Sequence, residues 1–420
     1  MNARELALDL LNRWPRSPAL ADELLEAALK TCSLNESDRG FAMELFYGCL
    51  RRQLALNFLL ARLVDKAPRP VIANVLKLGV YQLLFLRTPA HAAVNETVAL
   101  ARKRGGEPEA KFVNAILRRA GRELEALSSE LQATRQREPW IYYSHPEWLW
   151  KRWTARFGHE SAAALGEWNN QPPPIYIRVN TLKTSGKPSG IAAEPTDNPL
   201  CWRVTDPSGL FRTQSFLSGE FYVQDPSTLT AVNVLDPQPG ESVLDLCAAP
   251  GGKTTYIAQK MQDRGRIIAA DSANSRLALV AENCRRLGVH ITATLACEGT
   301  RLDRCLRGEQ FHRVLVDAPC SNTGVLRRRV DLRWRIEEKE VTRLAQLQGK
   351  LLDAAAKLTR RGGILVYSTC SLEPEENEAV VAAFLTAHAG FAVETTRSLF
   401  PPRDGVDGAF VARFRQTNAA

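Results

Sequence analysis

Residues 243–255 of the chain read VLDLCAAPGGKTT, an apolar run followed by a glycine-rich turn. The run has the composition of a buried strand, and the turn is typical of a junction between a strand and a helix. Gly251 and Gly252 let the backbone approach a ligand closely, and the first amides of the following helix are free to bind it. The stretch therefore predicts a ligand-binding loop at the end of a strand.

Strand and helix alternate from this stretch to the end of the chain. We expect helices at 274–288 and 340–358, and strands at 241–249, 265–272, 290–297, 311–319, 362–371 and 408–416. This order predicts a mostly parallel, doubly wound α/β sheet, in which ligands bind beyond the carboxyl ends of the strands. Five chemically active side chains fall at those ends: Cys247, Asp271, Glu298, Asp317 and Cys370.

The spacing around the loop narrows the choice of ligand. A Walker A loop would need glycine at position 247, where this chain has Cys247, and the nicotinamide fingerprint G-x-G-x-x-G is absent. Asp271 follows Gly252 by 19 residues, the place from which a carboxylate binds ribose hydroxyls in nucleotide-binding α/β folds. S-Adenosylmethionine has a ribose and needs no pyrophosphate site, so it fits this pattern better than a nucleotide triphosphate.

The first 140 residues have a different pattern, with apolar residues at helical spacing in 5–14, 41–64, 71–86 and 111–127. We interpret 1–140 as an all-α bundle, 141–225 as a small connecting α+β subdomain, and 226–420 as the catalytic α/β domain. Residues 1–120 contain 18 Lys and Arg against 12 Asp and Glu. The bundle therefore has a basic surplus.

Positive charge is concentrated in two short clusters. The whole chain has a formal net charge of +9, which favours a polyanionic partner. Residues 326–335 read LRRRVDLRWR, with five arginines and one acid, and residues 102–104 read RKR. Either cluster could be only a solvated helix face. Trp334 among the arginines favours nucleic acid in the first, because aromatic rings stack on bases.

The cysteines give no metal or disulfide pattern, since none of the nine forms a C-x-x-C pair. We expect six of them to be small apolar residues of the core: Cys32, Cys49, Cys201, Cys284, Cys297 and Cys305. Cys320 and Cys370 differ, because each lies just past a strand at the ligand edge, in DAPC and STC. Carbon 5 of cytosine becomes nucleophilic when a thiolate adds to carbon 6, so a thiolate, an acid and a methyl donor together suit cytosine methylation.

Three motifs resemble those of the RNA cytosine-C5 methyltransferases: DLCAAPGGKTT at 245–255, DAPCSNTGVLRRRVDLRW at 317–334 and YSTCSLEPEENE at 367–378. The upstream RVNTL and VQDPST resemble the entry motifs of that family. AHAAVNETVALARK and KFVNAILRR resemble the helical domain of the antitermination factor NusB. The fusion is similar to the bacterial Sun/Fmu (RsmB) subgroup, which methylates a cytosine of 16S ribosomal RNA and has a Rossmann-like catalytic domain.

The resemblance implies roles for individual residues. Cys370 would be the nucleophile and Cys320 would assist product release, while Asp317 would contact the base near the cofactor, with Lys253 close by. Asp271 would bind the ribose, and Glu298 the adenine, although the family usually has Gly-Asp where this chain has Cys297-Glu298. The remaining cofactor contacts would come from one loop: Cys247, Ala248, Ala249, Pro250, Gly251, Gly252 and Lys253. Contacts to RNA are expected from Arg178, Asn180, Arg327, Arg328 and Arg333.

We therefore predict an S-adenosylmethionine-dependent cytosine-C5 methyltransferase whose substrate is 16S ribosomal RNA. The same reaction on transfer RNA, a non-catalytic RNA-binding or antitermination module, and an NTPase are the alternatives. No secretion signal or apolar run of about 18 residues is present, so a cytoplasmic protein without a membrane partner is expected. We also expect a monomer without a bound metal.

Overall fold

The computed structural model describes residues 1–86 and 88–417, and the chain divides into two compact units. The first unit comprises residues 1–172 and 326–335, and the second comprises residues 173–325 and 336–420. The predicted boundaries at 140 and 225 stay predictions. The expected connecting segment contributes a helix to the first unit and a small sheet to the second.

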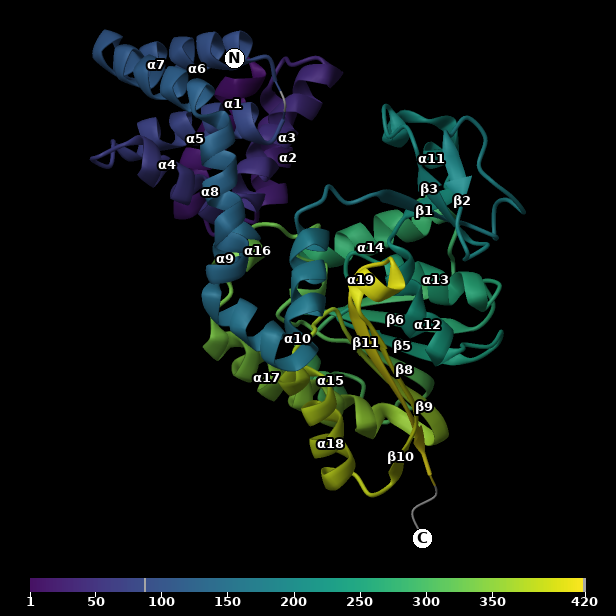
Figure 1. Ribbon diagram of the computed structural model, residues 1–420. Helices are drawn as coiled ribbons and strands as arrows, with labels where there is room; N and C mark the ends of the chain where they lie inside the picture. The colour runs from purple at the N-terminus through teal and green to yellow at the C-terminus, as the bar shows by residue number, and fades with distance from the viewer. Residues whose placement is uncertain (87, 418–420) are drawn as a thin grey trace. The chain divides into compact units, whose positions relative to one another are not determined.

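The first unit consists of helices, as expected (Figure 1). They are α1 (Ala3–Arg13), α2 (Ala21–Thr31), α3 (Glu36–Arg51), α4 (Gln53–Leu63), α5 (Pro70–Leu84), α6 (Ala90–Gly105), α7 (Glu107–Arg122), α8 (Leu124–Arg137), α9 (Pro139–Tyr142), α10 (Glu147–Asn169) and the short α16 (Leu332–Arg335). The expected helices at 41–64 and 111–127 are each divided, at Arg52 and at Glu123, where the backbone leaves the helical conformation.

Local sequence explains where these helices begin. Asn2 and Glu5 form a capping box at the start of α1, so two otherwise unpaired backbone amides are satisfied. Pro70 opens α5, where the missing amide proton costs no hydrogen bond. The helices bury a single apolar core that includes Leu56, Leu76 and, from the segment 326–335, Val330. This segment lies in sequence between the expected strands at 311–319 and 362–371, yet it packs as part of the helical unit.

The second unit contains a small sheet and a large one. The small sheet is antiparallel in the order β2-β3-β1-β4, from β1 (Ile175–Val179), β2 (Ala193–Pro195), β3 (Cys201–Val204) and β4 (Phe221–Val223), with α11 (Gln214–Leu217) before β4. Its core contains Ile177 and Phe221. The first two residues of the RVNTL motif, Arg178 and Val179, end β1.

The large sheet has seven strands in the order β10-β11-β9-β8-β5-β6-β7. Five of them are parallel: β5 (Ser242–Leu246), β6 (Arg266–Asp271), β7 (Thr292–Ala296), β8 (Phe311–Asp317) and β9 (Thr359–Thr369). At one edge, β11 (Ala409–Gln416) pairs antiparallel with β9, and β10 (Phe391–Leu399) pairs antiparallel with β11. All six expected strands are present. Strand β10 was not expected, because most of its side chains are exposed and give no apolar signal.

Helices cover both faces of the large sheet (Figure 1). One face packs on α12 (Leu229–Leu235), α13 (Gly252–Lys260) and α14 (Asn274–Leu287), and the other on α15 (Leu302–Cys305), α17 (Glu338–Leu358) and α18 (Glu378–Ala387); α19 (Pro401–Asp404) precedes β11. Val243 of β5 belongs to the first core, and Leu244 and Leu246 to the second. This alternation confirms the doubly wound α/β fold, and it places the strand-end residues at one edge.

Candidate active site

The loop after β5 has the form of a ligand cradle. Gly251 has φ of 101°, and a Cβ there would lie 3.1 Å from Cα of Val280, so only glycine fits. Gly252 begins α13, and a Cβ on it would lie 3.0 Å from the ring of Tyr222. The loop therefore packs closely against α14 and β4, and no side chain caps the first amides of α13. The Cys247 thiol at the loop start has a pKa raised to about 12 by burial and by nearby carboxylates, so it is not a nucleophile near neutral pH.

Asp271 ends β6 beside this cradle. Its carboxylate is buried, accepts from the amides of Ala249 and Ala273 at 3.3 Å each, and pairs with Arg276 at 3.3 Å. The carboxylate is thus held in a fixed position against the loop, as a protein group that binds ribose hydroxyls would need to be. Glu298, at the end of β7, is exposed and pairs with Arg301 at 3.4 Å.

Two cysteines near Glu298 correct an expectation from the sequence. Cys297 and Cys305 form a disulfide, whereas both were expected to be buried apolar thiols and no disulfide was expected. Cys297 is half-buried and Cys305 is exposed. The prediction was wrong because α15 turns back toward the end of β7, and a separation of eight residues gave no sign of that turn.

Asp317 and Lys253 form an ion pair at the carboxyl ends of the strands of the large sheet. Lys253 Nζ lies 2.7 Å from Asp317 Oδ2, and the Ser368 hydroxyl donates to the other carboxylate oxygen at 2.8 Å. Burial lowers the pKa of Lys253, but attraction to Asp317 and the hydrogen bond outweigh it, so the pKa is raised. The ammonium therefore stays charged beside a carboxylate that is held on both sides.

The thiols of Cys320 and Cys370, both expected at the site, lie in contact with each other. Cys320 Sγ lies 3.2 Å from Cys370 Sγ, and the Cys370 backbone amide points to Cys320 Sγ at 3.3 Å. The Cys370 thiol also donates to the side-chain oxygen of Asn322 at 3.1 Å. The hydrogen bond to Cys370 and burial raise the pKa of Cys320 well above its ordinary value. Cys320 is therefore held as a thiol, and Cys370 is the more exposed of the two.

The loops that carry the thiols approach each other through a glycine. The Gly324 amide donates to the Cys370 carbonyl at 2.9 Å, and the Gly408 amide donates to the Gly324 carbonyl at 2.8 Å. A Cβ on Gly324 would lie 2.7 Å from the Cys370 oxygen. Only glycine therefore allows this approach. Sequence reasoning had singled out neither Asn322 nor Ser368, although both lie within the quoted motifs.

A buried acid lies behind the cradle. Asp245 in β5 is inaccessible, and it accepts from the Thr254 hydroxyl of α13 at 2.6 Å. Burial raises its pKa to about 7, opposed by the Thr254 hydrogen bond. The contact anchors the first turn of α13, the turn that presents Lys253.

Two residues expected to contact RNA are internal supports of the second unit. Arg178 is buried and donates to the Gly252 carbonyl at 2.8 Å and to the Thr255 hydroxyl at 3.0 Å. Burial lowers its pKa to about 10. Asn180 is buried and donates to the carbonyls of Gly219 and Leu287 at 2.8 Å each. Arg178 thus fixes the start of α13, and Asn180 links the turn before β4 to the end of α14. Neither arrangement favours a direct contact with phosphate.

The arginines of residues 326–335 are engaged inside the helical unit. Arg333 is fully buried and donates to the Ser144 and Asn169 carbonyls at 3.1 and 2.9 Å. Arg327 is buried, with its guanidinium 4.3 Å from the centre of the Trp168 ring. Arg328 is half-buried. An RNA contact stays a prediction for all three, and the burial of Arg333 and Arg327 argues against it, because neither side chain is exposed to a ligand outside the helical unit.

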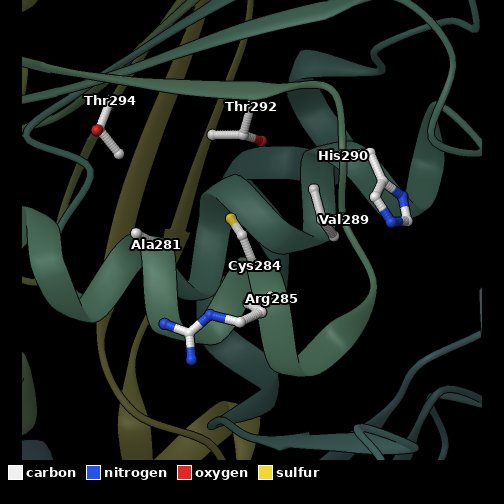
Figure 2. A pocket seen from close by; sticks show the side chains of 7 residues that line it. All are labelled: Ala281, Cys284, Arg285, Val289, His290, Thr292 and Thr294. Atoms are coloured by element: carbon white, nitrogen blue, oxygen red, sulfur yellow. The ribbon is translucent and has the colours of Figure 1, made fainter.

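A cavity of about 310 Å³ lies elsewhere, between the C-terminal half of α14 and β7 (Figure 2). It is lined by Ala281, Cys284, Arg285, Val289, His290, Thr292 and Thr294. None of these lining residues belongs to the strand ends that carry the cradle and the thiols, so the cavity is separate from them. Within residues 1–86 and 88–417, no cluster of three or more His, Cys, Asp or Glu could hold a metal ion. No helix in those ranges is long and apolar enough to span a bilayer.

Three family models match the chain. Residues 232–415 match the 16S rRNA methyltransferase RsmB/F model, and residues 1–122 match the NusB family. Residues 145–188 match the ferredoxin-like domain of RsmF/B-like methyltransferases. This last match spans α10 and β1, and therefore crosses from the first compact unit to the second.

Relatives are similar over nearly their whole length. The chain is 33% identical to the probable ribosomal RNA small subunit methyltransferase B of Bacillus subtilis, over 93% of this chain and 89% of the relative. It is 37% identical to the corresponding protein of Synechocystis, over 92% and 90%. The crystal structure of PH0851 aligns with a TM-score of 0.80 at 25% identity, over 99% of both chains. A methyltransferase homologue from Pyrococcus horikoshii aligns with a TM-score of 0.58 at 29% identity, over 66% of this chain and 97% of that one.

Proposed function

Because the chain belongs to the RsmB/F family of 16S rRNA methyltransferases, and is thus an S-adenosylmethionine-dependent RNA methyltransferase, we propose that it methylates carbon 5 of a cytosine in small-subunit ribosomal RNA. The reaction proceeds through a covalent bond between Cys370 and carbon 6 of the base. The observation that carries this proposal is the meeting of Cys320 and Cys370 at 3.2 Å, next to the Lys253–Asp317 pair.

The residues around the cradle fit S-adenosylmethionine. When bound, this cofactor supplies a methyl group on a positively charged sulfur. No side chain caps the start of α13 at Gly251, so the first amides of this helix could hold its methionine part, and the buried Asp271 carboxylate would bind the ribose hydroxyls. Glu298, which follows the neighbouring strand β7, would hold the adenine.

Cys370 is the nucleophile in this mechanism. Its thiolate adds to carbon 6, which raises the electron density at carbon 5 so that carbon 5 can take the methyl group. The proton that Cys370 gives up on becoming a thiolate is held at ring nitrogen 3 by the Asp317 carboxylate as negative charge develops on the ring. Lys253 keeps Asp317 in place and offsets its charge. The target cytosine must be unstacked to receive the thiolate, so it lies in a loop or is flipped out of a helix.

Cys320 completes the turnover. After methylation, carbon 5 carries both the methyl group and its original proton, and that proton must leave before the bond between Sγ of Cys370 and carbon 6 can break. Cys320 lies next to that bond: its sulfur takes the carbon 5 proton while its own thiol proton passes to the Cys370 sulfur, 3.2 Å away, as that sulfur leaves carbon 6. The raised pKa of Cys320 keeps it a thiol until this step, so the two thiols have separate roles.

The RNA backbone binds a basic face of α7. Lys111, Arg118 and Arg122 lie on one side of this helix, are exposed, and have no ion pair with any carboxylate among the described residues. The cluster at 102–104 is instead neutralised, because its three side chains pair with Glu107, Glu5 and Asp9 at 2.7, 2.7 and 2.6 Å. Uncompensated charge attracts phosphates, whereas paired charge would first have to give up its partner.

The test is methyl transfer from labelled S-adenosylmethionine to unmodified small-subunit ribosomal RNA and, in parallel, to unmodified transfer RNA. The products are digested and the modified nucleoside is identified. 5-Methylcytidine in ribosomal RNA alone supports both the reaction and the substrate. Label in transfer RNA alone would keep the chemistry and overturn the substrate, and a different methylated nucleoside would overturn the chemistry.

A further inference from the structure

Glu376 is a buried acid that the mechanism above does not use. It ends the short 3-10 turn Pro374–Glu376, which follows β9, and its side chain is inaccessible to solvent. Burying a carboxylate is costly unless hydrogen bonds satisfy it. A group of this kind beside two reactive thiols needs a physical reason.

Four donors from three parts of the chain converge on this carboxylate. The Ser321 amide and the Gln348 side chain donate to Oε1 at 2.9 and 3.0 Å. The hydroxyls of Ser321 and Ser371 both donate to Oε2. Each serine directly follows one of the two thiols, Ser321 after Cys320 and Ser371 after Cys370. The carboxylate therefore joins the loop after β8 to the loop after β9 at the residues next to the sulfur atoms.

A second layer holds Glu376 itself in place. The Tyr367 hydroxyl donates to the Glu376 carbonyl and to the side-chain oxygen of Gln348, the latter at 3.0 Å. Gln348 of α17 also donates to the Pro319 carbonyl at 3.0 Å. The Tyr367 and Gln348 side chains are fully buried. The network thus reaches both loops from the sheet and from α17, and the carboxylate is its common acceptor.

We propose that Glu376 is a positioning residue of the methyltransferase reaction, which holds the Cys320 and Cys370 loops together and confines the nucleophilic role to Cys370. The inference rests on the proposed function, in which the two thiols have separate roles. Glu376 touches neither thiol's sulfur, so it acts through Ser321 and Ser371.

Charge supports the part of the proposal that confines the nucleophilic role to Cys370. The titratable groups that act on Cys320 are Cys370 and Glu376, and both raise its pKa. Tyr367 is buried, and its own pKa is raised by burial and by these neighbours. Lys253 interacts electrostatically with Cys370. A negative charge at Glu376 disfavours a thiolate at Cys320.

The test compares Glu376→Gln with Glu378→Gln as its matched control. Glutamine keeps the shape and one acceptor oxygen but removes the charge and places an NH₂ group toward two hydroxyls; Glu378 lies two residues on, at the start of α18, and is exposed. Four quantities are measured: kcat, KM for RNA, Kd for S-adenosylmethionine, and the relative rates of iodoacetamide alkylation of Cys320 and Cys370, resolved by mass spectrometry. The melting temperature shows whether each variant is folded.

Glu376→Gln should lower kcat at least tenfold, with KM for RNA and the cofactor Kd within about twofold of wild type. It should also raise alkylation of Cys320 relative to Cys370 several-fold, whereas Glu378→Gln should change neither. Unchanged kcat with an unchanged alkylation ratio would overturn the proposal, and so would a lower kcat with an unchanged ratio, because general loosening would then suffice. The alkylation ratio needs no RNA, so it tests Glu376 even if the proposed substrate fails.

Discussion

The sulfur atoms of Cys320 and Cys370 lie 3.2 Å apart, although fifty residues separate them in the chain. Two neighbouring parallel strands, β8 and β9, end side by side and bring these residues to one point. The hydrogen bond between the thiols and the burial of Cys320 raise the pKa of Cys320, and Cys370 is the more exposed of the two. This difference in environment is the basis of the first two predictions.

Cys370→Ala should abolish methyl transfer while leaving the binding of S-adenosylmethionine within about twofold of wild type. The reason is that the cradle residues lie on β5, β6 and α13, and do not depend on the Cys370 side chain. Cofactor binding by calorimetry and methyl transfer to RNA are measured on the same preparation. Activity within a few-fold of wild type would rule out Cys370 as the nucleophile.

Cys320→Ala should instead trap the enzyme on its product. Without the group that serves proton removal from carbon 5, the bond between Cys370 and carbon 6 persists, and a covalent protein–RNA adduct accumulates. The adduct is detected as a band that resists denaturant in gel electrophoresis. The double variant with Cys370→Ala is the control and should give no band. Loss of turnover without any adduct would assign Cys320 a different role.

Much of this edge could be predicted from the sequence. Cys320, Cys370, Asp317 and Asp271 each follow an apolar run of strand type, and the carboxyl ends of parallel strands share one edge of a sheet. The alternation of strands and helices was therefore enough to predict that these side chains lie at the same edge of the sheet. It was not enough to predict their individual roles, because these depend on distances of a few ångströms between loops.

The arginines of 326–335 show where sequence reasoning failed. Five positive charges in ten residues resemble an RNA-binding segment, yet Arg333 bonds to groups more than 160 residues away in sequence. Local charge gives no information about such partners. Glu376 was missed for the same reason, since its donors come from Ser321 and Gln348, on segments distant in the chain.

Asp245 should make the stability of the second unit depend on pH. Its pKa is about 7 in the folded protein and near 3.8 when unfolded, so the folded state binds the extra proton between these values, and stability falls as pH rises through that window. Asp245→Asn removes this loss and keeps an acceptor for Thr254. As pH rises from about 5 to about 8, the free energy of unfolding of the variant should therefore increase by about 3 kcal/mol relative to that of wild type.

Hydrogen exchange of the β5 amides measures that gain, because it reports opening of this sheet separately from the helical unit. Wild type and Asp245→Asn are compared at both pH values after correction for the intrinsic exchange rate. An equal pH dependence in the two proteins would show that Asp245 is ionised in the folded state throughout this range.

The basic face of α7 should govern the salt dependence of RNA binding. Replacing Lys111, Arg118 and Arg122 by glutamine removes three unpaired charges, so the slope of log affinity against log salt should become shallower by about 2, at about 0.7 per phosphate of single-stranded RNA. Replacing Arg102, Lys103 and Arg104 by glutamine removes the same charge from a cluster that is already ion-paired. This matched control should change the slope by less than about 0.5 on the same reasoning. Filter binding of small-subunit RNA at several salt concentrations measures both slopes, and equal changes in the two variants would mean that only the net charge of the helical unit matters.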